Sequence, residues 1–244
     1  MNGTPFVRRA FEKGLRTMKQ LVASFLFHYF RNRKNFRLDE GEMSGMALQA
    51  AKRDLRKRMR STLQTSAATT NFLSLPEYQN AKSIAVYLSM PSGELSTTGI
   101  VKDALQRGKN VFIPYIHTQD KTSIMDMFAL GSMSEFESLQ LDKWGIPSLL
   151  STQIAGRPNG LTQGLDLIVM PGMAFDHGFR RLGHGKGYYD HFLTRYSTST
   201  RKMPFLVALS LQDQLLAEDI PVVEHDWLVD AIVVGDGQFL DRRV

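Results

Sequence analysis

The sequence predicts an α/β protein in which a mostly parallel β-sheet lies between two layers of helices. Short apolar runs of strand length alternate along the chain with segments of helical periodicity, which is typical of parallel sheets joined by helical crossovers. A glycine-rich stretch directly follows the apolar run 166–170, and α/β proteins place their ligands at the carboxyl ends of such strands. We therefore expect one three-layer domain over residues 46–244, preceded by an extension over residues 1–45.

The helices and strands are predicted in turn from periodicity and from the residues that interrupt it. Residues 47–63 are expected to form a helix rich in Lys and Arg, and residues 71–80 a further helix or turn. Residues 97–107 are expected to form a helix that stops at Gly108, because glycine readily adopts the left-handed conformation that ends a helix. The strands are short and apolar, and we place them at residues 83–90, 111–115, 125–130, 166–170, 205–209 and 231–234.

The net charge of +6 comes from the N-terminal end of the chain. Residues 1–38 hold nine of the 30 Lys and Arg residues and one of the 24 Asp and Glu residues, so they carry +8 and the remainder carries −2. A nucleic-acid partner is therefore not expected from the overall charge. Residues 1–38 also place apolar side chains at helical spacing among the basic ones, which is the composition of a mitochondrial transit peptide. The alternatives are a disordered basic tail and a mis-assigned start, with Met43 or Met46 as the true start. We expect a cytoplasmic protein, or a mitochondrial one if this segment is a transit peptide.

The composition narrows the kind of chemistry. There is no cysteine among the 244 residues, which excludes disulfides, thiolate zinc sites and cysteine nucleophiles. No apolar run approaches the roughly 18 residues of a membrane span, so no membrane partner is expected. A Gly-x-Ser-x-Gly motif for a serine hydrolase is also missing. Residues 131–164 are rich in loop signals, and we interpret them as an excursion over the sheet rather than a separate domain.

The stretch RLGHGKGYYD, residues 181–190, is the strongest candidate for a phosphate site. Glycine lets backbone N–H groups approach a ligand closely, and Lys186 between two glycines adds a positive charge. A helix that begins near Tyr188 and runs to about Arg195 points its N-terminus at the same place. The order Gly-x-Gly-Lys-Gly differs from a P-loop, because no Ser or Thr follows the lysine to bind Mg²⁺. The alternative is a tight turn between a strand and a helix.

Charged residues elsewhere are candidates for the same site. Lys52 and Arg56 lie four residues apart, so they share one helix face that can bind a triphosphate at two points; the alternatives are a solvated surface and contact with a nucleic-acid backbone. Asp190 in the first helical turn and Asp226 before the last strand are candidate Mg²⁺ ligands; a helix-dipole contact and an ordinary surface carboxylate are the alternatives. Glu94 follows the first strand and either accepts hydrogen bonds from a polar ligand or is a solvated loop acid.

Together these motifs resemble the 5-formyltetrahydrofolate cyclo-ligases, also called methenyltetrahydrofolate synthetases. The order and spacing match from about residue 47 to residue 234, and RLGHGKGYYD after a strand that ends in Met-Pro-Gly is highly specific. The resemblance implies a Rossmann-like domain of the kind also found in sugar-phosphate isomerases and CoA transferases. The other motifs that carry it are Lys52-x-x-x-Arg56, Leu88-Ser89-Met90-Pro91 followed by Glu94 and Thr97, Phe112-Ile113-Pro114, Met125-Asp126-Met127, Trp144-Gly145-Ile146-Pro147 and DLIVMPGMAFD.

The resemblance implies an enzyme, a ligase that forms a cyclic C–N bond. It implies that 5-formyltetrahydrofolate and ATP are the substrates, that Mg²⁺ is required, and that 5,10-methenyltetrahydrofolate, ADP and phosphate are the products. It further implies that the formyl oxygen attacks the γ-phosphate, that N10 closes on the activated carbon, and that phosphate then leaves. We expect a monomer that acts in folate metabolism. The alternative is a non-catalytic module of the same fold that binds folate or nucleotide.

The resemblance also implies roles for individual residues. Arg181 and Lys186 would be catalytic through contacts with phosphate, and Asp190 and Asp226 would bind Mg²⁺. The residues implied to bind ATP are Lys52, Arg53, Asp54, Leu55, Arg56, Arg181, Leu182, Gly183, His184, Gly185, Lys186, Gly187, Tyr188 and Tyr189. The residues implied to bind folate are Arg56, Leu88, Glu94, Trp144, His184, Gly185, Lys186, Gly187 and Tyr188. For Tyr189 and Trp144, packing within the protein is the alternative.

One feature departs from the family pattern. Family members usually carry a glycine, one variable residue and then Arg-Leu-Gly, whereas here the glycine is Gly178, one position earlier. Arg180 is therefore a second candidate for the role of Arg181.

Overall fold

The computed structural model describes residues 40–91, 93–119, 121–199 and 202–244. The chain divides into two compact units, residues 1–60 and residues 61–244, and the boundary falls inside helix α2, Glu40–Ser74. The targeting segment predicted over residues 1–38 lies outside the described residues. All the strands that the structure describes belong to the unit 61–244, which is described first.

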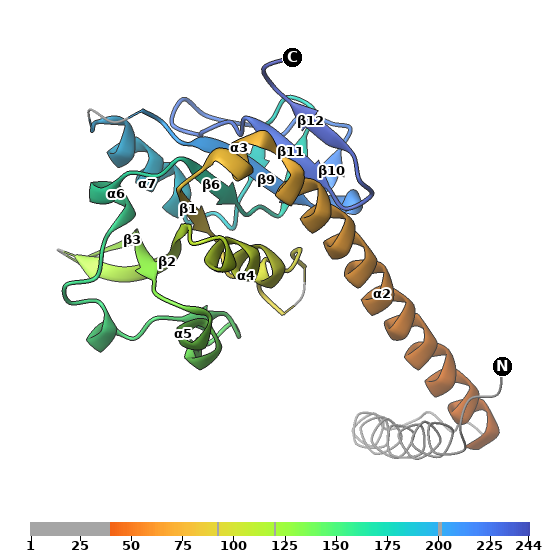
Figure 1. Cartoon of the computed structure of the whole chain (residues 1–244). Coiled ribbons are helices and arrows are strands. Elements are labelled where there is room, and N and C mark those ends of the chain that lie inside the picture. Colours follow the sequence, from red (N-terminus) through yellow and green to blue (C-terminus); the bar gives the residue numbers. More distant parts are fainter. Residues whose placement is uncertain (1–39, 92, 120, 200–201) are drawn as a thin grey trace. The chain divides into compact units, whose positions relative to one another are not determined.

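A seven-stranded sheet forms the centre of this unit (Figure 1). Its strand order is β12-β11-β9-β6-β1-β2-β3. The inner strands are parallel to one another, whereas the edge strands β3 and β12 are antiparallel to their neighbours. The bounds are Ser83–Val86 for β1, Asn110–Gln119 for β2, Thr122–Leu130 for β3, Leu167–Met170 for β6, Phe205–Ser210 for β9, Ala231–Val234 for β11 and Phe239–Asp241 for β12. The predicted mostly parallel α/β fold is confirmed.

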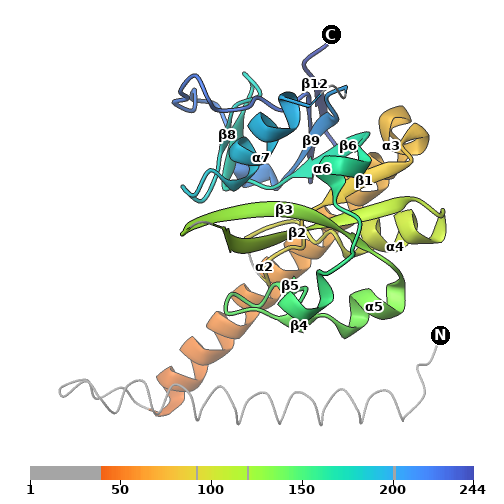
Figure 2. The same ribbon diagram turned by 90° about the vertical axis from the view of Figure 1, so that its left-hand side faces the viewer.

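Helices cover both faces of the sheet. Successive side chains of each inner strand point to opposite faces, so an apolar strand has side chains to bury on both. In β11, Ala231 and Val233 belong to a core cluster that includes Ile100 of α4 (Thr98–Gln106), whereas Ile232 belongs to one that includes Phe192 of α7 (Tyr188–Ser197). Figure 2 shows α4 and α7 on opposite sides of the sheet. The last turns of α2 and the short helix α3, Pro76–Asn80, share the cluster of α4. The three-layer arrangement is therefore as predicted.

Several element boundaries differ from those predicted, among them the end of the first helix, the end of β1, the end of β2 and the start of β3. The first helix does not stop at residue 63 but runs to Ser74, where Pro76 disfavours a helical conformation of the preceding Leu75 (φ −62°, ψ 133°). Strand β1 ends at Val86 rather than at residue 90. The carbonyl of Tyr87 accepts a hydrogen bond from the Thr97 hydroxyl at 2.6 Å, so the chain leaves the ladder there.

Short elements connect the main ones. Residues 131–164 are loop-rich as predicted, yet they contain two short helices, a 3₁₀ turn and a small hairpin. No helix among the described residues has both the length and the apolar character needed to cross a membrane. The short elements are α5 Met133–Ser138, β4 Gln140–Leu141, β5 Pro147–Ser148, η1 Ser151–Gln153, α6 Gly160–Gln163, β7 Ala174–Asp176, β8 Arg181–Leu182, η2 Gln212–Gln214 and β10 Leu215–Leu216.

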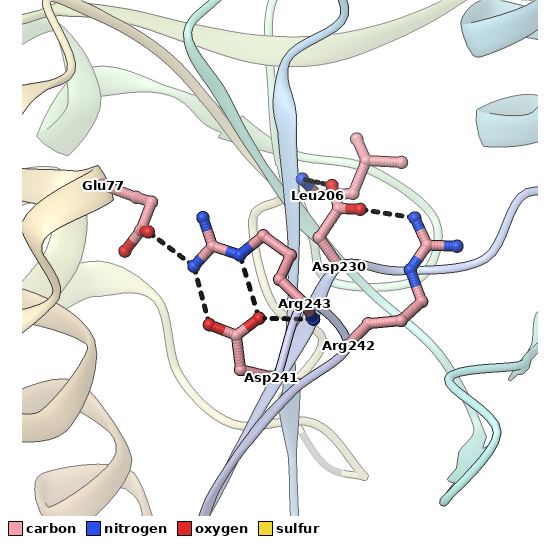
Figure 3. A network of polar contacts seen from close by, with 6 residues as sticks. All are labelled: Glu77, Leu206, Asp230, Asp241, Arg242 and Arg243. Atoms are coloured by element: carbon pink, nitrogen blue, oxygen red, sulfur yellow. Dashed lines mark hydrogen bonds and ion pairs between the residues drawn. The ribbon is translucent and has the colours of Figure 1, made fainter.

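A network of ion pairs attaches the C-terminal end to the rest of the unit (Figure 3). Arg243 donates to Glu77 of α3 at 2.6 Å and to both oxygens of Asp241 at 2.9 and 2.6 Å, which holds the pKa of Asp241 below its usual range. Arg242 donates to Asp230 at 2.6 Å, and the other oxygen of Asp230 accepts from the β9 backbone at 2.9 Å. These contacts hold the short edge strand β12 in place.

Candidate functional site

The glycine-rich stretch forms the connection between the β7–β8 hairpin and helix α7. Gly185 (φ 77°) and Gly187 (φ 64°) both have left-handed backbone conformations, which glycine adopts without a steric penalty. Gly187 is the N-cap residue of α7, so the loop ends at the positive end of the helix dipole. The predicted helix start at Tyr188 is confirmed.

The loop presents unpaired positive groups to solvent. Within the described part of the chain, no backbone N–H of residues 183–187 donates a hydrogen bond to the protein, and the Lys186 side chain makes no polar contact. His184, Gly185 and Lys186 are exposed. Free N–H groups, a free ammonium group and a helix N-terminus are together the arrangement that binds phosphate.

We predict that Gly185→Ala lowers both stability and activity. A left-handed alanine costs about 1 kcal/mol, and its methyl group would project into the open space over the loop where the predicted phosphate would bind. We expect a lower melting temperature and at least about a tenfold loss of turnover. The control is Gly108→Ala, since Gly108 has a similar φ (69°), likewise has no atom within 4 Å of an added Cβ, and lies at the end of α4. Equal activity losses in both variants would contradict the prediction.

Arg181 and Asp190 form a buried ion pair beneath the loop. The guanidinium donates to Asp190 at 2.6 Å, and the two side chains are 7% and 13% exposed. The other oxygen of Asp190 accepts a hydrogen bond from the backbone N–H of Trp227 at 3.1 Å. Nε of Arg181 is buried without a partner among the described residues. The pair therefore links the start of α7 to the segment that carries Asp226.

The predicted Mg²⁺ ligands Asp190 and Asp226 lie in adjoining segments. The backbone N–H of Trp227, the residue after Asp226, donates a hydrogen bond to Asp190. One oxygen of Asp226 accepts a hydrogen bond from the backbone N–H of Val223 at 2.8 Å. Over the described residues, no group of three or more Asp, Glu or His side chains is arranged to hold a metal ion. Mg²⁺ usually takes one or two carboxylates and completes its shell with water and substrate phosphates. Asp190 and Asp226, on segments that the Trp227 contact links, are the kind of ligand that this mode of binding uses.

The hairpin before the loop shows why the shifted glycine is tolerated. The left-handed position is Phe179 (φ 61°), one residue after Gly178. Its strain is offset by the buried Asp176, which accepts hydrogen bonds from the backbone N–H groups of Gly178 and Arg180 at 2.8 and 3.0 Å. Arg180 is itself paired with Asp176 and Asp219. Arg180 and Arg181 therefore have different partners in the protein.

Glu94 lies close to the glycine-rich loop. Its carboxylate accepts a hydrogen bond from the backbone N–H of Met90 at 2.8 Å. Burial raises the pKa of Glu94, while the Met90 N–H and the nearby His184 oppose this rise. Burial raises the pKa of Tyr189, and the nearby charge of Glu94 raises it further. A half-buried carboxyl group with a shifted pKa beside a glycine-rich loop is typical of a functional site.

Glu94→Gln is expected to change how stability depends on pH. Because the folded-state pKa of Glu94 is raised, its stabilising contribution is present at low pH and is lost as pH rises through that pKa. The wild-type free energy of unfolding should therefore decrease relative to that of Glu94→Gln between about pH 4 and neutrality. Urea unfolding across this range measures the difference. Glu137→Gln, at an exposed position, is the control; a constant difference for Glu94→Gln would contradict the prediction.

Trp144 lies in the turn between β4 and β5, and its side chain is 58% exposed. Ordinary core packing, the alternative to a place in the folate site, is therefore wrong. Lys143 Nζ lies 4.2 Å from the centre of the Trp144 ring. A Cβ at Gly145 would lie 2.9 Å from Pro91, so this turn packs against the loop that carries Glu94.

The other residues of this unit that were predicted to bind folate or ATP differ in how far their side chains are exposed. Leu88 is 6% exposed and belongs to the core cluster of α4. Tyr188 connects the loop to β3 through a 2.9 Å hydrogen bond between its hydroxyl and that of Ser123. The Tyr189 ring packs against both core clusters, and its hydroxyl is buried, which favours packing over stacking on a ligand.

The second predicted phosphate-binding segment belongs to the other unit, residues 1–60. Within α2, Lys52 and Arg56 are exposed and lie one helical turn apart, as their predicted role requires. Arg53, Asp54 and Leu55 between them are exposed as well. The role of this segment in ATP binding stays a prediction.

Sequence reasoning missed Gln214, which contacts two loops of the site. It follows β9 in the 3₁₀ turn η2, and its side-chain amide donates to the carbonyls of Gly93 and Gly172 at 3.1 Å each. A glutamine after a strand carries no signal of such contacts, because the partners are backbone atoms distant in the sequence.

Comparisons with known proteins agree with the predicted family. The sequence model of the 5-formyltetrahydrofolate cyclo-ligase family matches residues 33–235. A 5-formyltetrahydrofolate cyclo-ligase from Mus musculus is 36% identical over 205 residues, which cover 80% of this chain and 98% of that protein. A mitochondrial 5-formyltetrahydrofolate cyclo-ligase from Arabidopsis thaliana is 34% identical over 191 residues, which cover 72% and 67%.

A solved structure shows the same fold. The 5,10-methenyltetrahydrofolate synthetase from Aquifex aeolicus superimposes with a TM-score of 0.59 at 23% identity, over 93% of this chain and 94% of that one. The predicted enzyme class is confirmed by the family match and the named relatives. The chain belongs to the 5-formyltetrahydrofolate cyclo-ligase family.

Proposed function

We propose that this enzyme converts 5-formyltetrahydrofolate and ATP into 5,10-methenyltetrahydrofolate, ADP and phosphate, with Mg²⁺. Family membership supports the conversion of folate. The observation that supports ATP as the second substrate is the glycine-rich loop, whose N–H groups and Lys186 have no partner among the described residues and lie beside the half-buried Glu94. The loop would bind the phosphates of a nucleotide, and Glu94 would accept hydrogen bonds from a pterin. Their proximity suits a reaction between the two.

The chemistry explains why phosphate-binding groups are needed. The oxygen of a formamide is a poor leaving group, so the formyl oxygen first attacks the γ-phosphorus and ADP leaves. N10 then adds to the activated formyl carbon and loses its proton to solvent, and the C–O bond breaks with release of phosphate. Phosphoryl transfer requires mainly alignment and charge neutralisation from a protein. Lys186, Arg181 and the loop N–H groups would neutralise the transferred phosphoryl group.

The remaining residues would hold the two substrates. Glu94 would accept hydrogen bonds from the pterin N–H donors, and the exposed Trp144 would line the folate site. Lys52 and Arg56 would bind ATP phosphates. Asp190 and Asp226 would hold Mg²⁺, which supplies charge neutralisation at the phosphates when bound. Asp190 already accepts two hydrogen bonds, so metal binding would have to share or replace the contact with Arg181.

A direct assay tests the proposed function. The purified chain is incubated with 5-formyltetrahydrofolate, ATP and Mg²⁺, and the absorbance of the methenyl product is followed. We expect product to form only when all three are present, with one ADP released for each methenyl group formed. Absence of product at micromolar enzyme would contradict the proposal.

The compartment and the oligomeric state stay predictions. We expect a cytoplasmic monomer, and a mitochondrial location if residues 1–38 act as a transit peptide. One relative, from Arabidopsis thaliana, is named as mitochondrial. Mass spectrometry of the native N-terminus distinguishes the alternatives, because removal of a transit peptide leaves a new N-terminus near residue 38 and an internal start leaves Met43 or Met46.

A further inference from the structure

Gln214 connects three loops at one edge of the sheet. Strands β9, β6 and β1 are neighbours in the sheet and parallel, so their carboxyl ends lie side by side. Gln214 follows β9, Gly172 follows β6, and Gly93 follows β1. The Gln214 amide donates to the carbonyls of Gly172 and Gly93 at 3.1 Å each. One side chain therefore sets the spacing between two loops that the backbone ladder does not join.

The orientation of the Gln214 amide follows from its partners. Its oxygen accepts a hydrogen bond from the backbone N–H of Leu211 at 2.8 Å, while its nitrogen faces two carbonyls. A rotated amide would place its oxygen against two acceptors and its nitrogen against a donor. Both N–H donors are thus used, and no other side-chain group of the same length offers the same set of donors and acceptor.

Each connected loop leads directly to one half of the site. Gly93 immediately precedes Glu94. Gly172 is buried against the Phe175 ring and the stem of Arg181, since a Cβ at Gly172 would lie 2.7 Å from Phe175 Cζ and 3.1 Å from Arg181 Cγ. Movement of the Gly172 backbone would therefore displace Arg181, and movement of Gly93 would displace Glu94.

We propose that Gln214 is a positioning residue that fixes the distance between the folate-binding carboxyl group of Glu94 and the phosphate-binding groups around Arg181. This inference rests on the proposed function. The amide nitrogen already donates to two protein carbonyls and has no donor left for a substrate. It acts through Gly93 and Gly172. When Gln214 is replaced, the residues that bind each substrate are therefore still present. What is lost is the alignment of the formyl oxygen with the γ-phosphorus, and small displacements of reacting groups lower rates steeply.

The test compares Gln214→Leu and Gln214→Glu with the wild type. Leucine removes all three hydrogen bonds, while glutamate keeps the length and shape of the side chain but removes both donors, so it remains informative if the leucine variant folds poorly. Gln212→Leu makes the same chemical change at an exposed position of the same 3₁₀ turn and is the control. Measured quantities are kcat, the dissociation constants of 5-formyltetrahydrofolate and MgADP determined separately, and the melting temperature.

We expect kcat to fall about 10- to 100-fold in both Gln214 variants, while each dissociation constant changes by less than about threefold. The control should match the wild type. An unchanged kcat, or a loss of affinity in proportion to a lower melting temperature, would overturn the proposal and leave a structural role only. A wild-type enzyme that forms no methenyl product would instead overturn the proposed function, and this inference with it.

Discussion

Lys186→Ala is expected to lose at least about 100-fold in kcat with almost no change in stability. Removal of one preorganised charge that stabilises a transition state costs a few kcal/mol of activation free energy. The Lys186 side chain is exposed and makes no polar contact with the described part of the chain, so nothing in the fold depends on it. Steady-state kinetics and thermal unfolding of the same preparation measure the two effects.

The matched control for this change is Lys82→Ala. Lys82 is exposed and lies just before β1, at the amino ends of the parallel strands and thus at the opposite edge of the sheet. Lys82→Ala lowers the net charge of the protein by one, as Lys186→Ala does, but leaves the charge of the glycine-rich loop unchanged. A near-normal rate for Lys186→Ala, or an equal loss for Lys82→Ala through a general charge effect, would reject the assigned role.

Asp190→Asn is expected to reduce stability and activity together. The change leaves the Arg181 guanidinium, which is 7% exposed, without its charged partner. Removal of one member of a buried pair typically costs about 3 kcal/mol or more, because the remaining charge is still shielded from water. Activity should fall by at least about 100-fold, since Asn also removes a proposed Mg²⁺ ligand. Urea unfolding and Mg²⁺-dependent kinetics measure the two losses.

Asp226→Asn separates the two roles of Asp190. Asp226 has no ion pair among the described residues, and its carboxylate accepts a hydrogen bond from the Val223 N–H, which Asn can also accept. We expect this variant to unfold at nearly the wild-type urea concentration but to need more Mg²⁺ for activity. If Asp190→Asn proves as stable as Asp226→Asn, the ion pair with Arg181 contributes little to the fold.

The fold was predictable where burial alone decides the structure. The segment 231–234 was placed without error because an inner parallel strand is buried on both faces and is apolar throughout. The end of α2 was missed because its last turns combine polar and apolar residues, and the signal that ends it is Pro76. The polar end of β2 was missed too, since residues 116–119 form a strand only through pairing with β3.

The candidate site was predictable in its residue types but not in its contacts. The glycine-rich stretch and Glu94 are local signals, and the structure brings them together. The pairing of Arg181 with Asp190, and the contacts of Gln214, depend on which loops meet at the edge of the sheet. No local pattern encodes such contacts. Arg181 and Asp190 are nine residues apart but lie on a strand and a helix that the glycine-rich loop separates. The partners of Gln214 are backbone carbonyls of residues distant in the sequence.

The antiparallel edge strands have a consequence for how copies of this protein meet. On β3, the N–H of Ala129 donates to the carbonyl of Pro158, and the carbonyls of Ala129 and Met125 accept from the side chains of Arg157 and Arg195. The other edge, β12, is only three residues long. Exposed strand edges are the usual starting points of intermolecular sheet extension and of aggregation. Here Arg157 and Arg195 occupy backbone carbonyls of β3, and β12 offers only a short edge. Both features limit the backbone groups with which a second copy could extend the sheet.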